Sequence, residues 1–256
     1  MLDKNSPIKK LSDNISLRTD LDDSALKMMV KFINPHPLNH CYFENKSLGL
    51  SIGTCNAHAS NTRTRSDPTE PHPYNEFLTI IEGTAKIKQH RPNKQRAHST
   101  TISTGESFII PQGNCFDYQQ ASYLHQFYIR FTASTKIDPA IEEKIICLGN
   151  QAELNSGAQN NIPWQQTSDG YRKKIIYQNK NKSFTCGIWQ GNTFTTGMIT
   201  FPYNEFIHID QGSLVCIDSE GLTHTFNLGD AVFIPQGTRC SWQVSDKISL
   251  TFVQVS

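Results

Sequence analysis

Short segments rich in hydrophobic residues recur along most of the chain, and clusters of Gly, Pro and Asn separate them. Short strands punctuated by turn residues in this way are typical of an all-β sandwich or barrel. We therefore predict an all-β protein. The segments expected to form strands are 48–52, 76–81, 85–88, 107–110, 123–131, 184–189, 196–201, 205–209, 213–217, 222–226, 232–235 and 248–255.

Two segments have a pattern that favours a helix instead. The hydrophobic residues of 23–33 are spaced to bury one helical face. Segment 138–148 begins with Asp and Pro, which suit an N-cap and a first helical position, and a Gly follows it. We expect residues 1–40 to form an arm that packs on a neighbouring sheet or subunit, and the polar run 150–161 to be a linker.

One phrase of the sequence is written twice. Pro-Tyr-Asn-Glu-Phe occupies 73–77 and again 202–206, and in both copies six residues separate the Glu from a later Gly. A second phrase follows in the same order, since 105–113 reads Gly-Glu-Ser-Phe-Ile-Ile-Pro-Gln-Gly and 229–237 reads Gly-Asp-Ala-Val-Phe-Ile-Pro-Gln-Gly. This repetition indicates a gene duplication and predicts two related barrels in one chain.

The length agrees with this division, because 256 residues are enough for two domains that each bury a core. We expect a helix-containing connection between the barrels. The predicted parts are an N-terminal arm (1–40), an N-terminal barrel (41–135), a helix and linker (136–165) and a C-terminal barrel (166–256).

Composition excludes several partners. The net charge is +1, from 24 basic and 23 acidic residues, so there is no overall attraction to nucleic acid or anionic lipid. No run of hydrophobic residues is long enough for a membrane-spanning helix. The seven cysteines form no Cys-x-x-Cys pair, and we expect them to be reduced in a cytoplasmic protein. The expected partners are a small molecule and a second copy of the chain in a homodimer.

Candidate chemistry gathers just before and within the first repeated phrase. Alternate side chains of an extended strand share a face, so Glu70, His72, Tyr74 and Glu76 are predicted to point the same way. Glu70, His72 and Glu76 then provide a ligand set that suits Mn, Fe or Zn, and Glu76 is either a ligand or a general base. The residues expected to contact a substrate are Tyr74, Cys115, Phe116 and Tyr118.

The second copy tests this site from within the sequence. Aligned on the repeated phrase, Ile199 replaces Glu70 and Phe201 replaces His72, so only the N-terminal barrel is expected to hold a metal. Glu205 nevertheless matches Glu76. A Glu present without the His has another possible role, such as pairing with a buried Arg or binding an amine.

The repeated phrases resemble the motifs of a known superfamily. Glu-x6-Gly followed by Gly-acid-x4-Pro-x-Gly is similar to the two cupin motifs, and segments 187–189 and 205–212 resemble the ureidoglycine aminohydrolase-type branch. The resemblance implies two tandem RmlC-like jelly-roll barrels, a bicupin. Enzymes of that branch hold manganese with Glu-x-His-x3-His and a Gln, of which Glu70 and His72 match the first two ligands.

Two classes of function stay open. One is a metal-dependent enzyme, aminohydrolase-like, that acts on a small nitrogen-containing metabolite in the N-terminal barrel. The other is a binding or sensing module without catalysis or metal, in which Glu70 and Glu76 meet an amine and aromatic side chains surround it.

Overall fold

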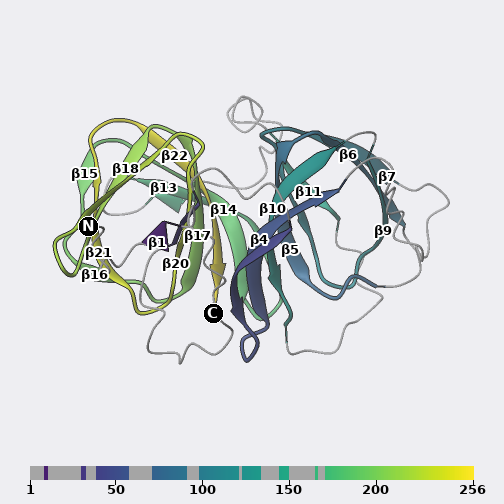
Figure 1. Ribbon diagram of the computed structural model, residues 1–256, viewed down its shortest axis with the longest axis horizontal. Helices are drawn as coiled ribbons and strands as arrows, with labels where there is room; N and C mark the ends of the chain where they lie inside the picture. Colours follow the sequence, from purple (N-terminus) through teal and green to yellow (C-terminus); the bar gives the residue numbers. More distant parts are fainter. Residues whose placement is uncertain are drawn as a thin grey trace. The chain divides into compact units, whose positions relative to one another are not determined.

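The computed structural model describes residues 9–10, 30–32, 39–57, 71–90, 98–120, 123–133, 144–149, 165–166 and 171–256. Within these ranges every regular element is a strand, so the predicted all-β class is confirmed. The chain divides into two compact units, Pro35–Ala158 and a second made of Gln159–Ser256 with Met1–Asn34. In each unit the strands wrap around an interior (Figure 1).

The N-terminal unit contains two sheets. A six-stranded sheet has the order β11-β8-β5-β10-β4-β3, and a three-stranded sheet has the order β7-β6-β9. Their side chains meet in one hydrophobic core, which includes Ile80, Ile87 and Phe108. The strands are β3 (His40–Asn45), β4 (Leu50–Ala57), β5 (Asn75–Glu82), β6 (Thr84–His90), β7 (His98–Ser103), β8 (Ser107–Ile110), β9 (Cys115–Gln120), β10 (Leu124–Phe131) and β11 (Ile146–Gly149).

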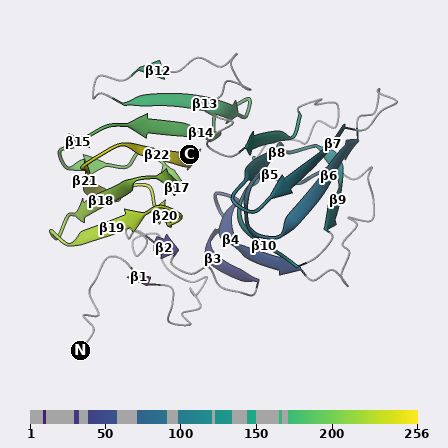
Figure 2. The same cartoon turned by 90° about the horizontal axis from the view of Figure 1, so that it is seen from above.

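The C-terminal unit repeats this plan with a wider first sheet. Its order is β1-β2-β20-β17-β22-β14-β13-β12, and Figure 2 shows the run from β12 to β22. The second sheet joins β15, β21, β18 and β19, with β16 also paired to β21. The strands are β1 (Lys9–Lys10), β2 (Val30–Phe32), β12 (Gln165–Gln166), β13 (Arg172–Gln178), β14 (Phe184–Gly191), β15 (Phe194–Thr195), β16 (Ile199–Thr200), β17 (Asn204–Gln211), β18 (Ser213–Asp218), β19 (Thr223–Asn227), β20 (Ala231–Ile234), β21 (Arg239–Val244) and β22 (Ile248–Val255).

Both helix predictions are wrong where the structure describes the residues. Residues 146–148 belong to β11, which pairs antiparallel with β8, and residues 30–32 form β2, which pairs with β20. In each case a strand edge offers backbone hydrogen bonds that local helical propensity does not outweigh. Residues 138–143 and 23–29 lie outside the described residues.

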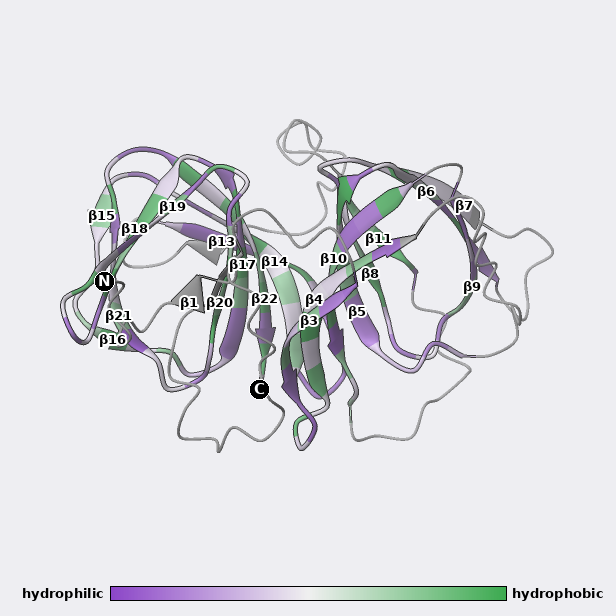
Figure 3. Ribbon diagram, in the orientation of Figure 1, coloured by the Kyte–Doolittle hydropathy of each residue, from purple (hydrophilic) through white to green (hydrophobic). Residues whose placement is uncertain are grey.

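Hydrophobic and hydrophilic residues alternate along several strands (Figure 3). In β6, Ala85 and Ile87 are buried while Lys86 and Lys88 are exposed, as expected where one face of a strand meets water. By contrast β5 is buried at every position from Asn75 to Ile80. Polar side chains on such a strand point into the protein and need partners there.

The two units share local backbone contacts at equivalent positions. The His72 N–H donates to the Asn114 carbonyl over 2.7 Å, and the Gly113 N–H donates back to His72 over 2.8 Å. Phe201 makes the same two bonds with Thr238 and Gly237, at 2.9 and 2.8 Å. Positions 72 and 201 therefore occupy the same place in the two barrels.

The backbone conformation at the end of each Glu-x6-Gly phrase requires a glycine. Gly83 and Gly212 have φ values of +98° and +80°, which side chains disfavour. A Cβ at Gly83 would also lie 2.2 Å from the Tyr123 carbonyl oxygen, and one at Gly212 would lie 2.3 Å from that of Lys247. The motif thus marks the same tight turn in both copies.

Candidate functional site

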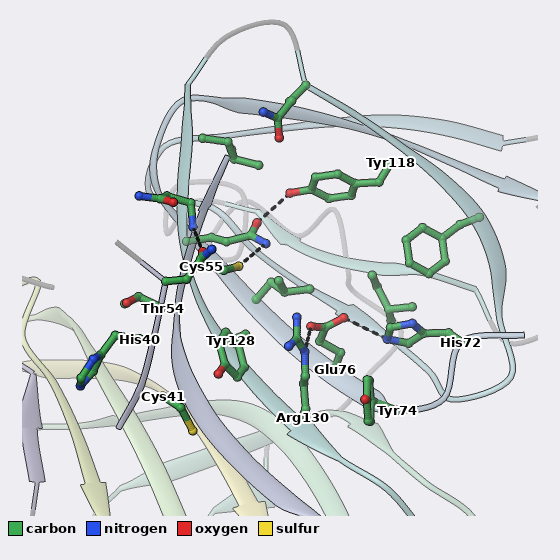
Figure 4. Close-up of a pocket in the computed structure, with 18 residues that line it drawn as sticks. His40, Cys41, Thr54, Cys55, His72, Tyr74, Glu76, Tyr118, Tyr128 and Arg130 are labelled. Atoms are coloured by element: carbon green, nitrogen blue, oxygen red, sulfur yellow. Dashed lines mark hydrogen bonds and ion pairs between the residues drawn. The ribbon is translucent and has the colours of Figure 1, made fainter. Parts of the chain in front are cut away.

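The N-terminal barrel encloses a cavity of about 810 Å³. Its walls come from the segment before β5 and from β3, β4, β5, β8, β9 and β10. Hydrophobic and polar side chains share the lining, which is typical of a small-molecule site. Figure 4 shows the residues around it.

Most of the predicted site residues line this cavity. His72, Tyr74, Glu76, Phe116 and Tyr118 all contribute to the wall. His72 and Tyr74 precede β5, so the backbone bonds around position 72, and not strand alternation alone, direct them inward.

Among the described residues, one predicted site residue does not line the cavity. Cys115 alternates with Phe116 along β9 and is not among the residues that line the cavity. Glu70 lies outside the described residues. The metal ligand set Glu70, His72 and Glu76 therefore has two members whose positions the structure gives.

Glu76 is the centre of a buried polar cluster (Figure 4). It lies opposite Arg130 in the β5–β10 register, and the Arg130 Nε donates to Glu76 Oε1 over 2.6 Å. The other carboxylate oxygen, Oε2, lies 2.9 Å from His72 Nε2. Two basic side chains, the half-buried Arg130 and the buried His72, thus share one carboxylate.

The cluster keeps Glu76 ionised. Burial alone would raise the pKa of the Glu76 carboxyl, but the hydrogen bond from His72 and the charge of Arg130 lower the pKa to about 2. A carboxylate with so low a pKa is a weak base, which argues against Glu76 as a general base. Both oxygens also have donors already, which argues against Glu76 as the site for a ligand amine.

Arg130 lines the cavity and is the charged residue that the sequence analysis did not single out. Its side chain is 34% exposed, and its guanidinium carbon lies 4.1 Å from the centre of the Tyr128 ring and 5.7 Å from that of Tyr74. The two aromatic rings hold the guanidinium by cation–π contact. Apart from Nε, no guanidinium nitrogen has a hydrogen bond to the described residues, so the terminal amino groups are available to a ligand.

A second polar group lies on β9, β10 and β4. The Tyr118 hydroxyl donates to Gln126 Oε1 over 2.7 Å, and Gln126 Nε2 donates to Cys55 Sγ over 3.2 Å. Burial raises the pKa of Tyr118, so its phenol stays neutral. In Figure 4 the hydrogen-bonded group that includes Tyr118 and Cys55 lies apart from the Glu76 cluster. A ligand can therefore meet polar groups at two places in the cavity.

A metal site is incomplete within the described residues. His72 and Glu76 provide two donor atoms, and no group of three His, Cys, Asp or Glu side chains in this part of the chain could hold a metal ion. A metal needs about three protein ligands. The described residues alone therefore do not fit a resident metal.

The C-terminal barrel has a different polar cluster at the same place. Glu205 lies opposite Gln254 in the β17–β22 register, and Gln254 Nε2 donates to Glu205 Oε1 over 3.0 Å. Phe201 stands where the first barrel has His72. Burial raises the pKa of Glu205 to about 7, because the bond from Gln254 and the charge of Lys173 offset only part of the desolvation.

Comparison with known proteins establishes the fold class. Residues 178–249 match the family model of the EutQ-like cupin domain. No curated protein sequence matches the chain. Among the described residues, no helix has the length and hydrophobicity that a membrane crossing requires.

Several solved structures share this fold over most of the chain. A protein of unknown function from Pseudomonas syringae pv. tomato, of the DUF861 family, has a TM-score of 0.65 at 17% identity, over 84% of this chain and 85% of its own. A cupin 2 conserved barrel domain protein from Leptotrichia buccalis has a TM-score of 0.55 at 10% identity, over 86% and 88%. The protein Ylba from E. coli, also of the DUF861 family, has a TM-score of 0.53 at 10% identity, over 85% and 82%.

The shared fold and the match of the C-terminal barrel together define a cupin-type jelly-roll fold. The C-terminal barrel carries the match to the EutQ-like cupin domain. Identities this low describe the fold and leave the activity open. The narrower resemblance to ureidoglycine aminohydrolase-type cupins is not established by these matches.

Proposed function

We propose that the N-terminal barrel binds a small organic acid and that Arg130 holds its acidic group. One observation carries the proposal: a guanidinium on the wall of an 810 Å³ cavity keeps its terminal amino groups available while its Nε binds Glu76. A guanidinium presents a planar fork of donors that matches a carboxylate or phosphate.

The charges of the site support an anionic ligand. Arg130 and His72 share the single carboxylate of Glu76, so an added anion meets two basic side chains and one acidic side chain. Tyr128, at 4.1 Å, and Glu76 hold the guanidinium in place before a ligand arrives. Such pre-organisation reduces the entropy that binding costs.

The rest of the cavity suits an organic body. Its volume lies in the range of sites for small molecules. Leu78, Ile110 and Phe116 provide hydrophobic wall, and Gln126 with Tyr118 provides a polar contact away from Arg130. The ligand class is therefore an organic acid with a hydrophobic part, and not a bare inorganic anion.

Titration calorimetry tests this function. The ligands are aromatic and aliphatic carboxylates, each measured beside its uncharged amide of the same shape. Wild-type protein should prefer the acids, and Arg130→Gln should weaken acid binding by at least about tenfold while binding of the amides changes little. Arg130→Lys, which keeps the charge and loses the fork, should give an intermediate loss.

Arg239→Gln is the matched control, because Arg239 is exposed on the other unit. It should leave acid binding unchanged. Equal affinity for acids and amides, or acid binding that survives Arg130→Gln, would show that Arg130 is not the anion site. Circular dichroism of each variant separates loss of binding from loss of fold.

A metal-dependent enzyme is the second candidate. The observation that favours it is the 2.9 Å between His72 Nε2 and Glu76 Oε2, since two atoms bound to one metal lie on the order of 3 Å apart. Glu70 would supply the third ligand, with Mn, Fe or Zn as the metal. When bound, such a metal supplies a Lewis acid or an activated water. The resemblance to aminohydrolase-type cupins implies a small nitrogen-containing substrate.

Elemental analysis of protein purified without added metal tests this candidate. A stoichiometric transition metal that disappears in both Glu70→Ala and His72→Ala would support the enzyme. Metal-free protein that still binds organic acids would favour the binding function without a metal.

A further inference from the structure

The C-terminal barrel contains a second, smaller cavity, of about 200 Å³, which the function proposed for the first barrel does not use. Rings surround it. The indoles of Trp189 and Trp242 lie 6.2 Å apart and nearly perpendicular, and Phe201 lies 5.5 Å from Trp242. The other aromatic residues of its wall are Tyr171, Phe194, Tyr203 and Phe252.

The cavity is electrically balanced. Lys173 Nζ donates to Gln254 Oε1 over 3.1 Å, and Gln254 Nε2 donates to Glu205 Oε1 over 3.0 Å. Lys173 Nζ also lies 4.2 Å from the centre of the Phe252 ring. One basic and one acidic side chain thus meet through one amide, whereas two basic side chains share a carboxylate in the first barrel.

Two polar groups of this wall have unused hydrogen-bonding capacity. Glu205 accepts its bond through Oε1, and no described residue donates to its Oε2. The buried indole N–H of Trp242 finds no oxygen or nitrogen acceptor among the described residues, and its only acceptor there is the thiol sulfur of Cys240, which is a weak one. Both residues line the cavity and are more than nine-tenths buried. A buried donor or acceptor left without a partner is costly, so a ligand that satisfies both gains affinity.

The first barrel has a hydrogen-bond acceptor at a position where the second barrel has none. Tyr118 occupies the position of Trp242 there, and its hydroxyl donates to Gln126 over 2.7 Å. The C-terminal barrel has Leu250 in place of Gln126, and Leu250 also lines the cavity. The acceptor has thus been replaced by a hydrophobic side chain while a donor remains.

We propose that this cavity binds a small uncharged ring compound that carries a hydroxyl group, with phenol as the simplest example. The hydroxyl donates to Glu205 Oε2 and accepts from the Trp242 indole N–H, and the ring packs against the aromatic wall. An apolar cavity of about 150 Å³ is known to hold benzene, so the volume here suits one substituted ring.

Charge decides against the alternatives. A carboxylate ligand would meet Lys173 but also Glu205, and an ammonium ligand would meet Glu205 but also Lys173. Either would enter a largely buried site in which the one basic and the one acidic side chain already offset each other, which is unfavourable. Ile199 and Tyr203 line the cavity and are 40% and 39% exposed, so the cavity reaches the surface where a ligand can enter.

Tryptophan fluorescence gives a site-specific test, because all three Trp residues of the chain fall between 164 and 242. Phenol, toluene, benzoate and benzylamine are titrated into the full-length protein. Phenol should bind most tightly, at one site per chain by calorimetry. Glu205→Gln, and separately Trp242→Phe, should each weaken phenol binding by roughly five- to tenfold while toluene binding changes less.

Two further variants make the result decisive. Leu250→Gln restores the acceptor of the first barrel, so it should compete for the indole N–H and weaken phenol binding. Arg130→Gln, in the other cavity, should leave phenol binding unchanged. The proposal is overturned if phenol does not bind, if benzoate or benzylamine binds more tightly than phenol, or if Glu205→Gln and Leu250→Gln bind phenol as the wild type does.

Discussion

Glu76 and Arg130 face each other across neighbouring strands, and 2.6 Å separates Glu76 Oε1 from the Arg130 Nε. The same register in the other barrel places Glu205 opposite the amide of Gln254. The pKa of the carboxyl is about 2 in the first case and about 7 in the second. The side chains around a repeated Glu, and not the Glu itself, thus determine whether it is ionised.

Arg130→Gln should therefore raise the pKa of Glu76 above its wild-type value of about 2. The substitution removes the half-buried positive charge that favours the ionised carboxyl. Carbon-detected NMR titration of the Glu side chains measures the shift. The reverse change, Gln254→Arg, should lower the pKa of Glu205 from about 7. A Glu76 titration unaffected by Arg130→Gln would mean that His72 alone stabilises the charge.

Stability should depend on pH in opposite ways in the two barrels. In the folded protein the pKa of Glu205 is raised from 4.5 to about 7. The stability that this carboxyl contributes is therefore fully present below pH 4.5 and is lost as the pH rises through about 7. Relative to the wild type, the free energy of unfolding of Glu205→Gln should rise by up to ~3 kcal/mol between pH 4 and pH 8. Urea unfolding followed by tryptophan fluorescence reports this barrel.

Glu76 should show the opposite sign. Its folded pKa is lowered from 4.5 to about 2, so the stability it contributes is present above pH 4.5 and is lost as the pH falls through about 2. Glu76→Gln should destabilise the N-terminal barrel at pH 7, because it leaves Arg130 without its counter-charge, and the loss should shrink at low pH. Hydrogen exchange of β5 and β10 amides measures this barrel separately.

Metal content should not exceed one ion per chain, because His72 is present only in the N-terminal barrel and Phe201 replaces it in the other. After incubation with Mn or Zn and desalting, His72→Ala should abolish any binding and Glu205→Gln should leave it unchanged. Elemental analysis measures the stoichiometry. A value near two, or an ion at Glu205, would contradict the expected difference between the barrels.

Gly53→Ala should destabilise the N-terminal barrel by about 2–4 kcal/mol. A Cβ at Gly53 would lie 2.2 Å from the His40 carbonyl oxygen and 2.5 Å from the Tyr128 hydroxyl, so Tyr128 must move away from Arg130. Binding of organic acids should weaken with it. Gly197→Ala is the control, since its Cβ would have no neighbour within 4 Å. Thermal unfolding measures both.

Much of the fold was readable from the sequence. Segment 107–110 was predicted as a strand and is β8, and segment 248–255 is β22, because turn residues and repeated phrases delimit both. Segment 146–148 could not be assigned correctly, because its strand exists only through pairing with β8. Pairing at a sheet edge is a long-range interaction that local propensity does not report.

The candidate site was predictable only in part, because one member of it depends on the pairing of two strands. His72, Tyr74 and Glu76 stand out because they flank a repeated phrase, and the structure brings them to one cavity. Arg130 lies between hydrophobic residues near the end of β10, and only the register of β10 with β5 shows that it meets Glu76. One signal could have found Arg130. It is a charged residue within a predicted strand, and the second copy of that strand has the polar Gln254 at the aligned position.

The backbone bonds that hold position 72 in one barrel and position 201 in the other support an imidazole and a phenyl ring equally well. Side chains at these points can therefore be interchanged without rebuilding the scaffold. The double variant Phe201→His, Gln254→Arg would test whether binding of organic acids can be transferred to the C-terminal barrel. The two barrels share one backbone plan, but a few interior side chains give them cavities of about 810 and 200 Å³ with different polar groups.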